Sequence, residues 1–266
     1  MNMVISPVDR VQFGEPLWHA DGDLLALAYA ADGTLWSVEE PGVVRQWDGD
    51  GRLLARRTLG ETETLWAFGP RAELLVSASD DLVIWDLAKG CEPITLPQAS
   101  WVTAVAFHPT RRVIATGHDD GSVRLWHLTG DTGTAAEFLH HEQPVSALAF
   151  HGDGSVLATA SEDHQIAVWD VQTGQLRRAF VGHTDRIPAL AWQPGSNILL
   201  SAGWDTTVRV WDIDTGEPTM LLNTHSDQVH AMAFNPNGGL LAVADSSGAV
   251  RIWGEIGRGK ELRVLS

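Results

Sequence analysis

A short apolar stretch that ends in tryptophan recurs along the chain at a nearly constant interval, and this repeat constrains the fold more than any other feature. It occurs six times, as VVRQW, DLVIW, SVRLW, QIAVW, TVRVW and AVRIW. The tryptophans lie 38 to 43 residues apart, at Trp47, Trp85, Trp126, Trp169, Trp211 and Trp253. Because these stretches are rich in β-branched and aliphatic residues, they predict strands rather than helices. A repeat of this length is typical of an array of similar structural units.

Each repeat contains more than one predicted strand. The alternating apolar segments VTAVAFHP, VSALAFHG, IPALAWQP and VHAMAFNP precede turn-forming residues, and the apolar runs VIATG, VLATA, ILLSA and LLAVA come next. After the tryptophan, DVQTGQ and DIDTGE supply the Asp and Gly of another tight turn. Turn residues between apolar runs are typical of hairpins. The pattern therefore predicts four antiparallel strands per repeat and no helix.

The way these units pack, and the residues that flank them, suggest a known family. A lone four-stranded sheet with apolar side chains on both faces cannot bury them, whereas sheets stacked around an axis cover one another. Gly182-His183 and Trp211-Asp212 resemble the WD40 repeat, as do His141 and Trp169-Asp170. The resemblance covers roughly residues 19–253. It implies an all-β fold, a WD40-type β-propeller of four-stranded antiparallel blades, and we expect residues 1–266 to form a single propeller domain.

The resemblance also implies a structural tetrad, in which a loop His, a strand Ser or Thr, a turn Asp and the strand Trp share hydrogen bonds. A buried indole and imidazole need such partners. Two blades match the tetrad fully, with His141, Thr159, Asp163 and Trp169, and with His183, Ser201, Asp205 and Trp211. Two match it without the His, with Ser77, Asp81 and Trp85, and with Thr116, Asp120 and Trp126. The sixth repeat has Val243 and Ser247 at tetrad positions. We expect the first and last blades to be the loosest.

The sequence does not decide how many blades close the ring. Seven blades, the commonest number in the family, need about 294 residues, and this chain has 266. Residues 10–18 resemble an outer strand that could complete the last blade, but residues 261–266 could be that strand themselves. Three alternatives follow. The ring closes with six blades, the chain is a piece of a longer seven-bladed protein, or another chain supplies a blade.

Charge and cysteine content narrow the classes of partner. The chain has 34 acidic and 18 basic residues, a net charge of −16, and no run of Lys or Arg. Such a chain repels phosphate, so we expect no direct contact with nucleic acid or an anionic membrane. Cys91 is the only cysteine, which excludes an internal disulfide. Without a secretory signal or an 18-residue apolar run, the sequence predicts a soluble, intracellular, cytoplasmic protein.

The sequence contains no convincing catalytic or metal-binding motif. His141, Thr159 and Asp163 resemble a catalytic triad, but the same set recurs in the next repeat, as expected of structural hydrogen bonds and not of an active site. Residues 48–51, DGDG, resemble the start of a calcium loop, yet Leu59 occupies the twelfth position where Glu is required. We therefore predict no enzyme activity, no cofactor and no metal site.

Loop side chains at one end of the blades are the candidate binding residues. In the WD40 family, the loop before the inner strand and the turn before the third strand face the top surface, around the channel mouth. The resemblance places there Trp101, Asp119, Glu162, Arg186, Trp204 and Gln228. Exposed aromatic and Arg side chains are typical binding hot spots. The alternative is that each tryptophan merely packs on a neighbouring loop.

The hypothesis that follows is a non-catalytic scaffold that binds a protein or peptide through its top face. The acidic balance favours a basic partner. One alternative is a repeat block of a larger multidomain regulatory protein. Another is a propeller enzyme, which would need carboxylates, histidines or a nucleophile at the channel mouth in addition to the tetrads.

Overall fold

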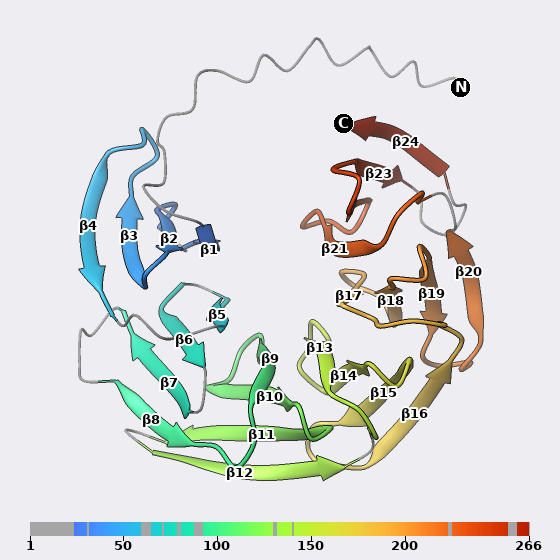
Figure 1. Cartoon of the computed structure of the whole chain (residues 1–266), viewed down its shortest axis with the longest axis horizontal. Coiled ribbons are helices and arrows are strands. Elements are labelled where there is room, and N and C mark those ends of the chain that lie inside the picture. The colour runs from blue at the N-terminus through green and yellow to red at the C-terminus, as the bar shows by residue number, and fades with distance from the viewer. Residues whose placement is uncertain are drawn as a thin grey trace.

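Every regular element in the described part of the chain is a β-strand, as the repeat pattern predicts. The computed structural model describes residues 24–30, 32–59, 65–70, 72–78, 81–87, 93–129, 132–139, 141–222, 225–254 and 260–265. Its strands form six separate four-stranded sheets arranged around an axis (Figure 1). The prediction of an all-β propeller with antiparallel four-stranded blades is confirmed, and the structure shows six blades.

Each blade takes four consecutive strands in chain order. Blade 1 has β1 (Leu24–Tyr29), β2 (Leu35–Glu39), β3 (Val43–Trp47) and β4 (Leu53–Thr58). Blade 2 has β5 (Leu65–Phe68), β6 (Leu74–Ala78), β7 (Asp81–Asp86) and β8 (Ile94–Pro97). Blade 3 has β9 (Val102–Phe107), β10 (Val113–His118), β11 (Ser122–Thr129) and β12 (Thr132–Leu139). Blade 4 has β13 (Val145–Phe150), β14 (Val156–Ser161), β15 (Gln165–Asp170) and β16 (Leu176–Val181). Blade 5 has β17 (Ala189–Trp192), β18 (Ile198–Ala202), β19 (Val208–Asp212) and β20 (Pro218–Leu222). Blade 6 has β21 (Val229–Phe234), β22 (Leu240–Asp245), β23 (Val250–Gly254) and β24 (Lys260–Leu265).

The turn between the first two strands of blade 4 shows why glycine is needed where it stands. Gly154 has φ of 75°, a left-handed conformation that is costly for other residues. It also packs against blade 3, because a Cβ built on it would lie 2.2 Å from the imidazole ring of His108. Backbone conformation and close packing both require glycine here, so a local turn also fixes the contact between two blades.

In blades 2 to 6, the repeated tryptophan anchors the blade to the preceding one. Trp169 of blade 4 belongs to a buried cluster with Val113 and Leu125 of blade 3. Trp211 of blade 5 likewise packs with Ile166 and Val168 of blade 4. Burial of a large apolar side chain contributes roughly 1.5–3 kcal/mol. The core of the molecule is therefore a series of layers between blades.

The ring has an opening between its first and last blades. Inner strands of successive blades contact one another from β1 through β5, β9, β13 and β17 to β21. Figure 1 shows blades 1 and 6 on the two sides of a gap. Apolar side chains of β1 are exposed, including Leu27 at 47% and Tyr29 at 70%.

Of the two segments that could complete the last blade, one is placed by the structure. Strand β24 pairs with β23, so the C-terminal segment supplies the outer strand of blade 6. Residues 10–18 and Cys91 lie outside the described residues. The structure thus shows six blades without direct packing of β21 on β1 across the gap.

Candidate functional site

A chain of three hydrogen bonds crosses blade 4 from its tryptophan to the top loop. The Trp169 indole donates to the Thr159 hydroxyl at 3.2 Å, and that hydroxyl lies 2.8 Å from His141 Nε2. His141 Nδ1 lies 3.0 Å from Asp163 Oδ2. The network assigns Nδ1–H as the donor to the carboxylate. Burial alone would raise the pKa of Asp163, but the hydrogen bonds from His141 and from the backbone N–H groups of Gln165 and Glu142, with the charge of His141, together hold that pKa below its ordinary value.

Blade 5 repeats this arrangement with serine in place of threonine. Trp211 donates to the Ser201 hydroxyl at 2.8 Å, and Ser201 lies 2.7 Å from His183 Nε2. His183 Nδ1 is 2.8 Å from Asp205 Oδ2, which also accepts the backbone N–H of Thr184 at 3.1 Å. The carboxylate therefore ties the loop before β17 to the turn before β19. Because these hydrogen bonds are buried and recur in two blades, their role is to hold the loops in place.

Blade 3 uses a histidine that sequence reasoning missed. His118, the last residue of β10, places Nε2 2.9 Å from the Thr116 hydroxyl, which accepts the Trp126 indole N–H at 3.0 Å. Gln98, at the usual loop position, donates instead to a backbone carbonyl. Alternate strand residues share a face, so His118 stands beside Thr116. That spacing of two is the signal that could have revealed it. Burial and the nearby Arg124 lower the pKa of His118.

Asp120, assigned from the sequence to the partial tetrad of blade 3, has a local role in the structure. Its carboxylate accepts the backbone N–H and the hydroxyl of Ser122, at 2.9 and 2.6 Å. Arg124 lies 3.9 Å away. Asp120 thus caps its own turn, whereas Trp126 bonds the Thr116 hydroxyl and that hydroxyl bonds His118.

Blade 6 has its aspartate two residues earlier than sequence comparison places it. His225 Nδ1 lies 3.0 Å from Asp245 Oδ2, and both side chains are buried. Ser247, at the expected position, donates to Asp245 instead. Val243 replaces the central hydroxyl of the network. Among the described residues, neither His225 Nε2 nor Trp253 Nε1 has a hydrogen-bond partner.

The first two blades keep only the inner part of the network. In blade 1, Trp47 donates to Ser37 at 3.1 Å, and Ser37 lies 3.2 Å from Glu39, which pairs with the buried Arg45. In blade 2, Trp85 donates to Ser77 at 3.2 Å.

Asp81 is not part of the blade 2 network, contrary to the sequence assignment. It is the exposed first residue of β7, opposite Pro97, and no hydrogen bond joins it to Ser77 or Trp85 in the described structure. The turn of this blade is two residues shorter, so its aspartate begins the strand.

The residues that the sequence places on the top face are brought together in pairs. We use "top loops" for residues 98–101, 141–144, 183–186 and 225–228, with the turns 119–121, 162–164, 203–207 and 246–249. In four blades a turn N–H donates to a loop carbonyl at 2.9 to 3.0 Å, from Asp119 to Trp101, Glu162 to Pro144, Trp204 to Arg186 and Ser246 to Gln228. These repeated bonds hold the loop before each inner strand against the next turn.

A row of side chains crosses the top loops from blade 4 to blade 6. Arg186 Nη1 lies 3.1 Å from Glu162 Oε1, and its guanidinium carbon is 5.1 Å from the centre of the Trp204 ring. The His230 ring meets Trp204 edge-on at 5.9 Å and bonds Ser246 at 2.6 Å. Trp204 is half-buried by these contacts. Sequence reasoning missed His230, two residues after Gln228, and Ser246, which occupies in blade 6 the turn position that Asp119 has in blade 3.

The remaining top-face candidates differ in exposure. Trp101 is 45% exposed, and the neighbouring Asp119 is also exposed. Gln228 is half-buried behind Ser246. Trp101 therefore presents an open aromatic surface, whereas Trp204 packs on its neighbours, as the alternative interpretation expects.

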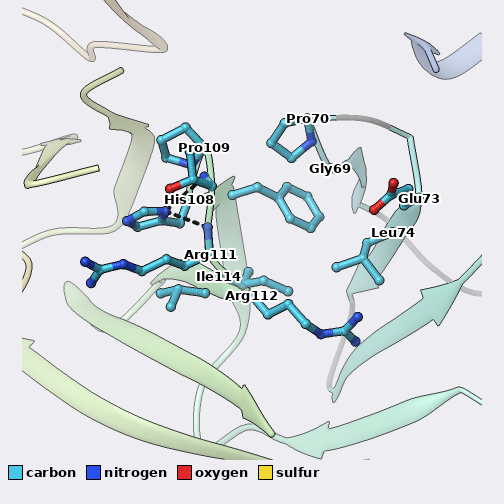
Figure 2. Close-up of a pocket in the computed structure, with 12 residues that line it drawn as sticks. Gly69, Pro70, Glu73, Leu74, His108, Pro109, Arg111, Arg112 and Ile114 are labelled. Atoms are coloured by element: carbon cyan, nitrogen blue, oxygen red, sulfur yellow. Dashed lines mark hydrogen bonds between the residues drawn. The ribbon is translucent and has the colours of Figure 1, made fainter. Parts of the chain in front are cut away.

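A hollow lies between blades 2 and 3 at the end opposite to the top loops (Figure 2), and the sequence analysis did not predict it. It is lined by apolar side chains, including Pro70, Leu74 and Phe107, and by the polar or charged Glu73, His108, Thr110, Arg111 and Arg112. In its wall, His108 Nδ1 accepts the backbone N–H groups of Thr110 at 3.2 Å and Arg111 at 3.0 Å. Burial, with the charge of Arg111, lowers the pKa of His108. The histidine thus stabilises a turn as a neutral imidazole.

Within the described residues, no group of three or more His, Cys, Asp or Glu side chains could hold a metal ion. None of the described elements is a helix long and apolar enough to cross a membrane.

Comparison with known proteins identifies a family and a relative that matches over part of its length. A family model described as Nucleolar protein 10-like, N-terminal domain, matches residues 61–253. The chain is also similar to U3 small nucleolar RNA-associated protein 15 of Saccharomyces cerevisiae, with 36% identity over 78 residues. That alignment covers 27% of this chain and only 15% of the yeast protein.

Proposed function

This chain belongs to the family of the Nucleolar protein 10-like N-terminal domain, and on that premise we propose that it is a non-catalytic WD40-type scaffold that binds a protein or peptide partner. Its binding surface is the set of top loops. The observation that supports this role is the row of Glu162, Arg186, Trp204 and His230 across three blades. Trp101 adds an exposed aromatic side chain.

The loops suit binding because their backbones are already fixed. Four turn-to-loop hydrogen bonds and the His–Asp pairs of blades 4, 5 and 6 hold them in place. A preorganised surface loses less conformational entropy when a partner docks. Partly desolvated Arg and Trp side chains are the residue types that contribute most at interfaces.

The relatives bear on the kind of partner. The name of the yeast protein associates it with an RNA. For this chain, a net charge of −16 opposes contact with phosphates. We therefore propose that the partner is a protein, including in any assembly that contains RNA.

The compartment is part of the same proposal. The sequence alone predicts a cytoplasmic location, whereas both matched names refer to the nucleolus. We propose that the protein is intracellular, which agrees with either location. Imaging of a fluorescent fusion in the native cell distinguishes the cytoplasm from the nucleolus.

The experiment compares two triple variants as baits in a native lysate, with bound proteins identified by mass spectrometry. The first removes the top-face side chains by Trp101→Ala, Arg186→Ala and Trp204→Ala. The control removes exposed leucines of outer strands by Leu53→Ala, Leu176→Ala and Leu221→Ala. Both must unfold cooperatively like the wild type.

We expect a protein that the wild type and the control retain and the top-face variant loses. Binding of that purified protein, measured by calorimetry, should weaken at least tenfold in the top-face variant. Equal binding by all three baits would contradict a top-face site.

A further inference from the structure

The central channel has an apolar wall. Its cavity of about 390 Å³ is lined by the inner strands of blades 2 to 6, and this volume falls in the range of roughly 300–1,000 Å³ found for ligand pockets. Each inner strand places one large apolar residue there, two positions before its final aromatic residue, namely Trp66, Val105, Leu148, Leu190 and Met232. All but Trp66 are half-buried. The channel thus presents a ring of apolar side chains.

Hydroxyl groups near the channel mouth are satisfied within the protein. Thr103 Oγ1 donates to the Val145 carbonyl at 2.6 Å, and Ser146 Oγ donates to the Ile187 carbonyl at 2.7 Å. Each bond joins one blade to the next. Pro188, at the same position in blade 5, has no donor. The only titratable side chain among the described residues that line this cavity is His230, so the wall offers mainly apolar contact.

The loops around the channel mouth are acidic. Trp101, Arg186 and Gln228 each stand two residues before a residue that lines the channel. Besides the aspartates bonded to histidine, the described top loops contain Asp119, Asp120, Glu142, Glu162, Asp185 and Asp227. Their only Lys or Arg is Arg186, which already pairs with Glu162. This arrangement favours a cation at the mouth.

We infer that the partner of the proposed scaffold is a peptide segment that inserts one apolar side chain into the channel and places an adjacent Lys or Arg against the acidic top loops. The inference rests on the proposed function. The apolar side chain is removed from water by the wall of Leu148, Leu190 and Met232. The cation lies beside Asp185 and Asp227, whose charges have no ion pair among the described residues.

A random-peptide display selection on the full chain tests this inference, with dissociation constants measured for synthetic copies of the selected peptides. We expect sequences that combine Lys or Arg with a neighbouring Leu, Ile, Met or Phe. Met232→Gln and Val105→Thr, which preserve side-chain shape, should weaken binding about tenfold, the effect of losing roughly 1.4 kcal/mol. Leu221→Gln on an outer strand is the matched control and should leave binding unchanged.

A separate pair of variants tests the contact between the peptide's Lys or Arg and the acidic top loops. Asp185→Asn and Asp227→Asn keep the side-chain oxygen that accepts the next backbone N–H, at 2.7 and 2.8 Å. The double variant should bind the peptides several-fold more weakly, and this difference should shrink in high salt. Matched neutralisation on the opposite face, Asp214→Asn with Glu217→Gln, should change nothing.

The outcomes separate this inference from the function on which it rests. Peptides that depend on Trp101, Arg186 and Trp204 but are indifferent to Met232→Gln and Val105→Thr would overturn the channel inference and leave the scaffold. Acidic or wholly polar selected sequences would do the same. If no peptide is retained, or if the top-face variant binds as well as the wild type, both fail.

Discussion

Blades 4 and 6 have nearly the same strand pattern, yet their surroundings differ on one face. On the face toward the next blade, Val156, Ala158 and Ile166 of blade 4 are buried. The matching Leu240 of blade 6 is 39% exposed, and its neighbours on that face are half-exposed. Burial of a blade is therefore decided by the presence of the blade that follows it, more than by its own sequence.

The buried polar networks of these blades differ as well. In blade 4 the Thr159 hydroxyl bonds both His141 and Trp169. In blade 6, Val243 takes that place, and the facing nitrogens of His225 and Trp253 lack partners among the described residues. A single hydroxyl thus separates a satisfied network from an unsatisfied one, and an unsatisfied buried donor costs roughly 1–3 kcal/mol.

The largest effect should come from removing an anchor between blades. Trp211→Ala deletes a side chain that is 2% exposed and packs on blade 4, so it should lower the free energy of unfolding by about 3–5 kcal/mol. Chemical denaturation measures this. Trp101→Ala is the control, with an effect within about 0.5 kcal/mol, as expected for an exposed residue. Equal losses would show that layers between blades do not dominate stability.

A reciprocal exchange tests the hydroxyl directly. Thr159→Val should destabilise by roughly 1–3 kcal/mol, because two buried nitrogens lose their partner. Val243→Thr should stabilise by about 1 kcal/mol, because the new hydroxyl serves both His225 and Trp253. Thermal and urea unfolding of the two variants check the opposite signs. A destabilised Val243→Thr would mean that blade 6 cannot orient the hydroxyl as blade 4 does.

The gap between the last and first blades can be probed by truncating matching residues. Val156→Ala in blade 4 should cost about 1–2 kcal/mol, whereas Leu240→Ala in blade 6, although a larger truncation, should cost less than about 1 kcal/mol. The free energy of unfolding in urea measures both. A larger loss for Leu240→Ala would indicate that something covers this face in solution.

The smallest expected effect is the dependence of the free energy of unfolding on pH. The pKa values of His118 in blade 3 and His108 are lowered, so the unfolded chain binds protons more readily than the folded one. Stability from this source is complete above about pH 6.5 and is lost as the pH falls toward the folded-state pKa values. Urea unfolding between pH 7 and pH 5 should show a shallow decrease. The decrease should become smaller in His118→Gln, and an unchanged slope would contradict this account.

The repeat made the architecture predictable from the sequence. The spacing of the tryptophans predicted six repeats and alternation predicted four strands in each, but the number of blades in the ring stayed open until the structure showed six. The tetrads of blades 4 and 5 could be assigned because the family resemblance supplies fixed positions for all four residues. Blades 3 and 6 departed from those positions, since His118 and Asp245 reach the network from the end of the second strand. Their role depends on which face of the strand they share with Thr116 and Val243.

The sequence by itself determined the strands, their turns and their grouping into blades, because side-chain alternation and turn chemistry act over a few neighbouring residues. The tertiary structure alone decided which faces are covered, since burial depends on blades far apart in the chain. It also decided that Trp204 packs between Arg186 and His230 while Trp101 stays exposed. The two tryptophans lie in different loops of the top face, and Trp204 is covered by Arg186 of its own blade and by His230 of the next blade.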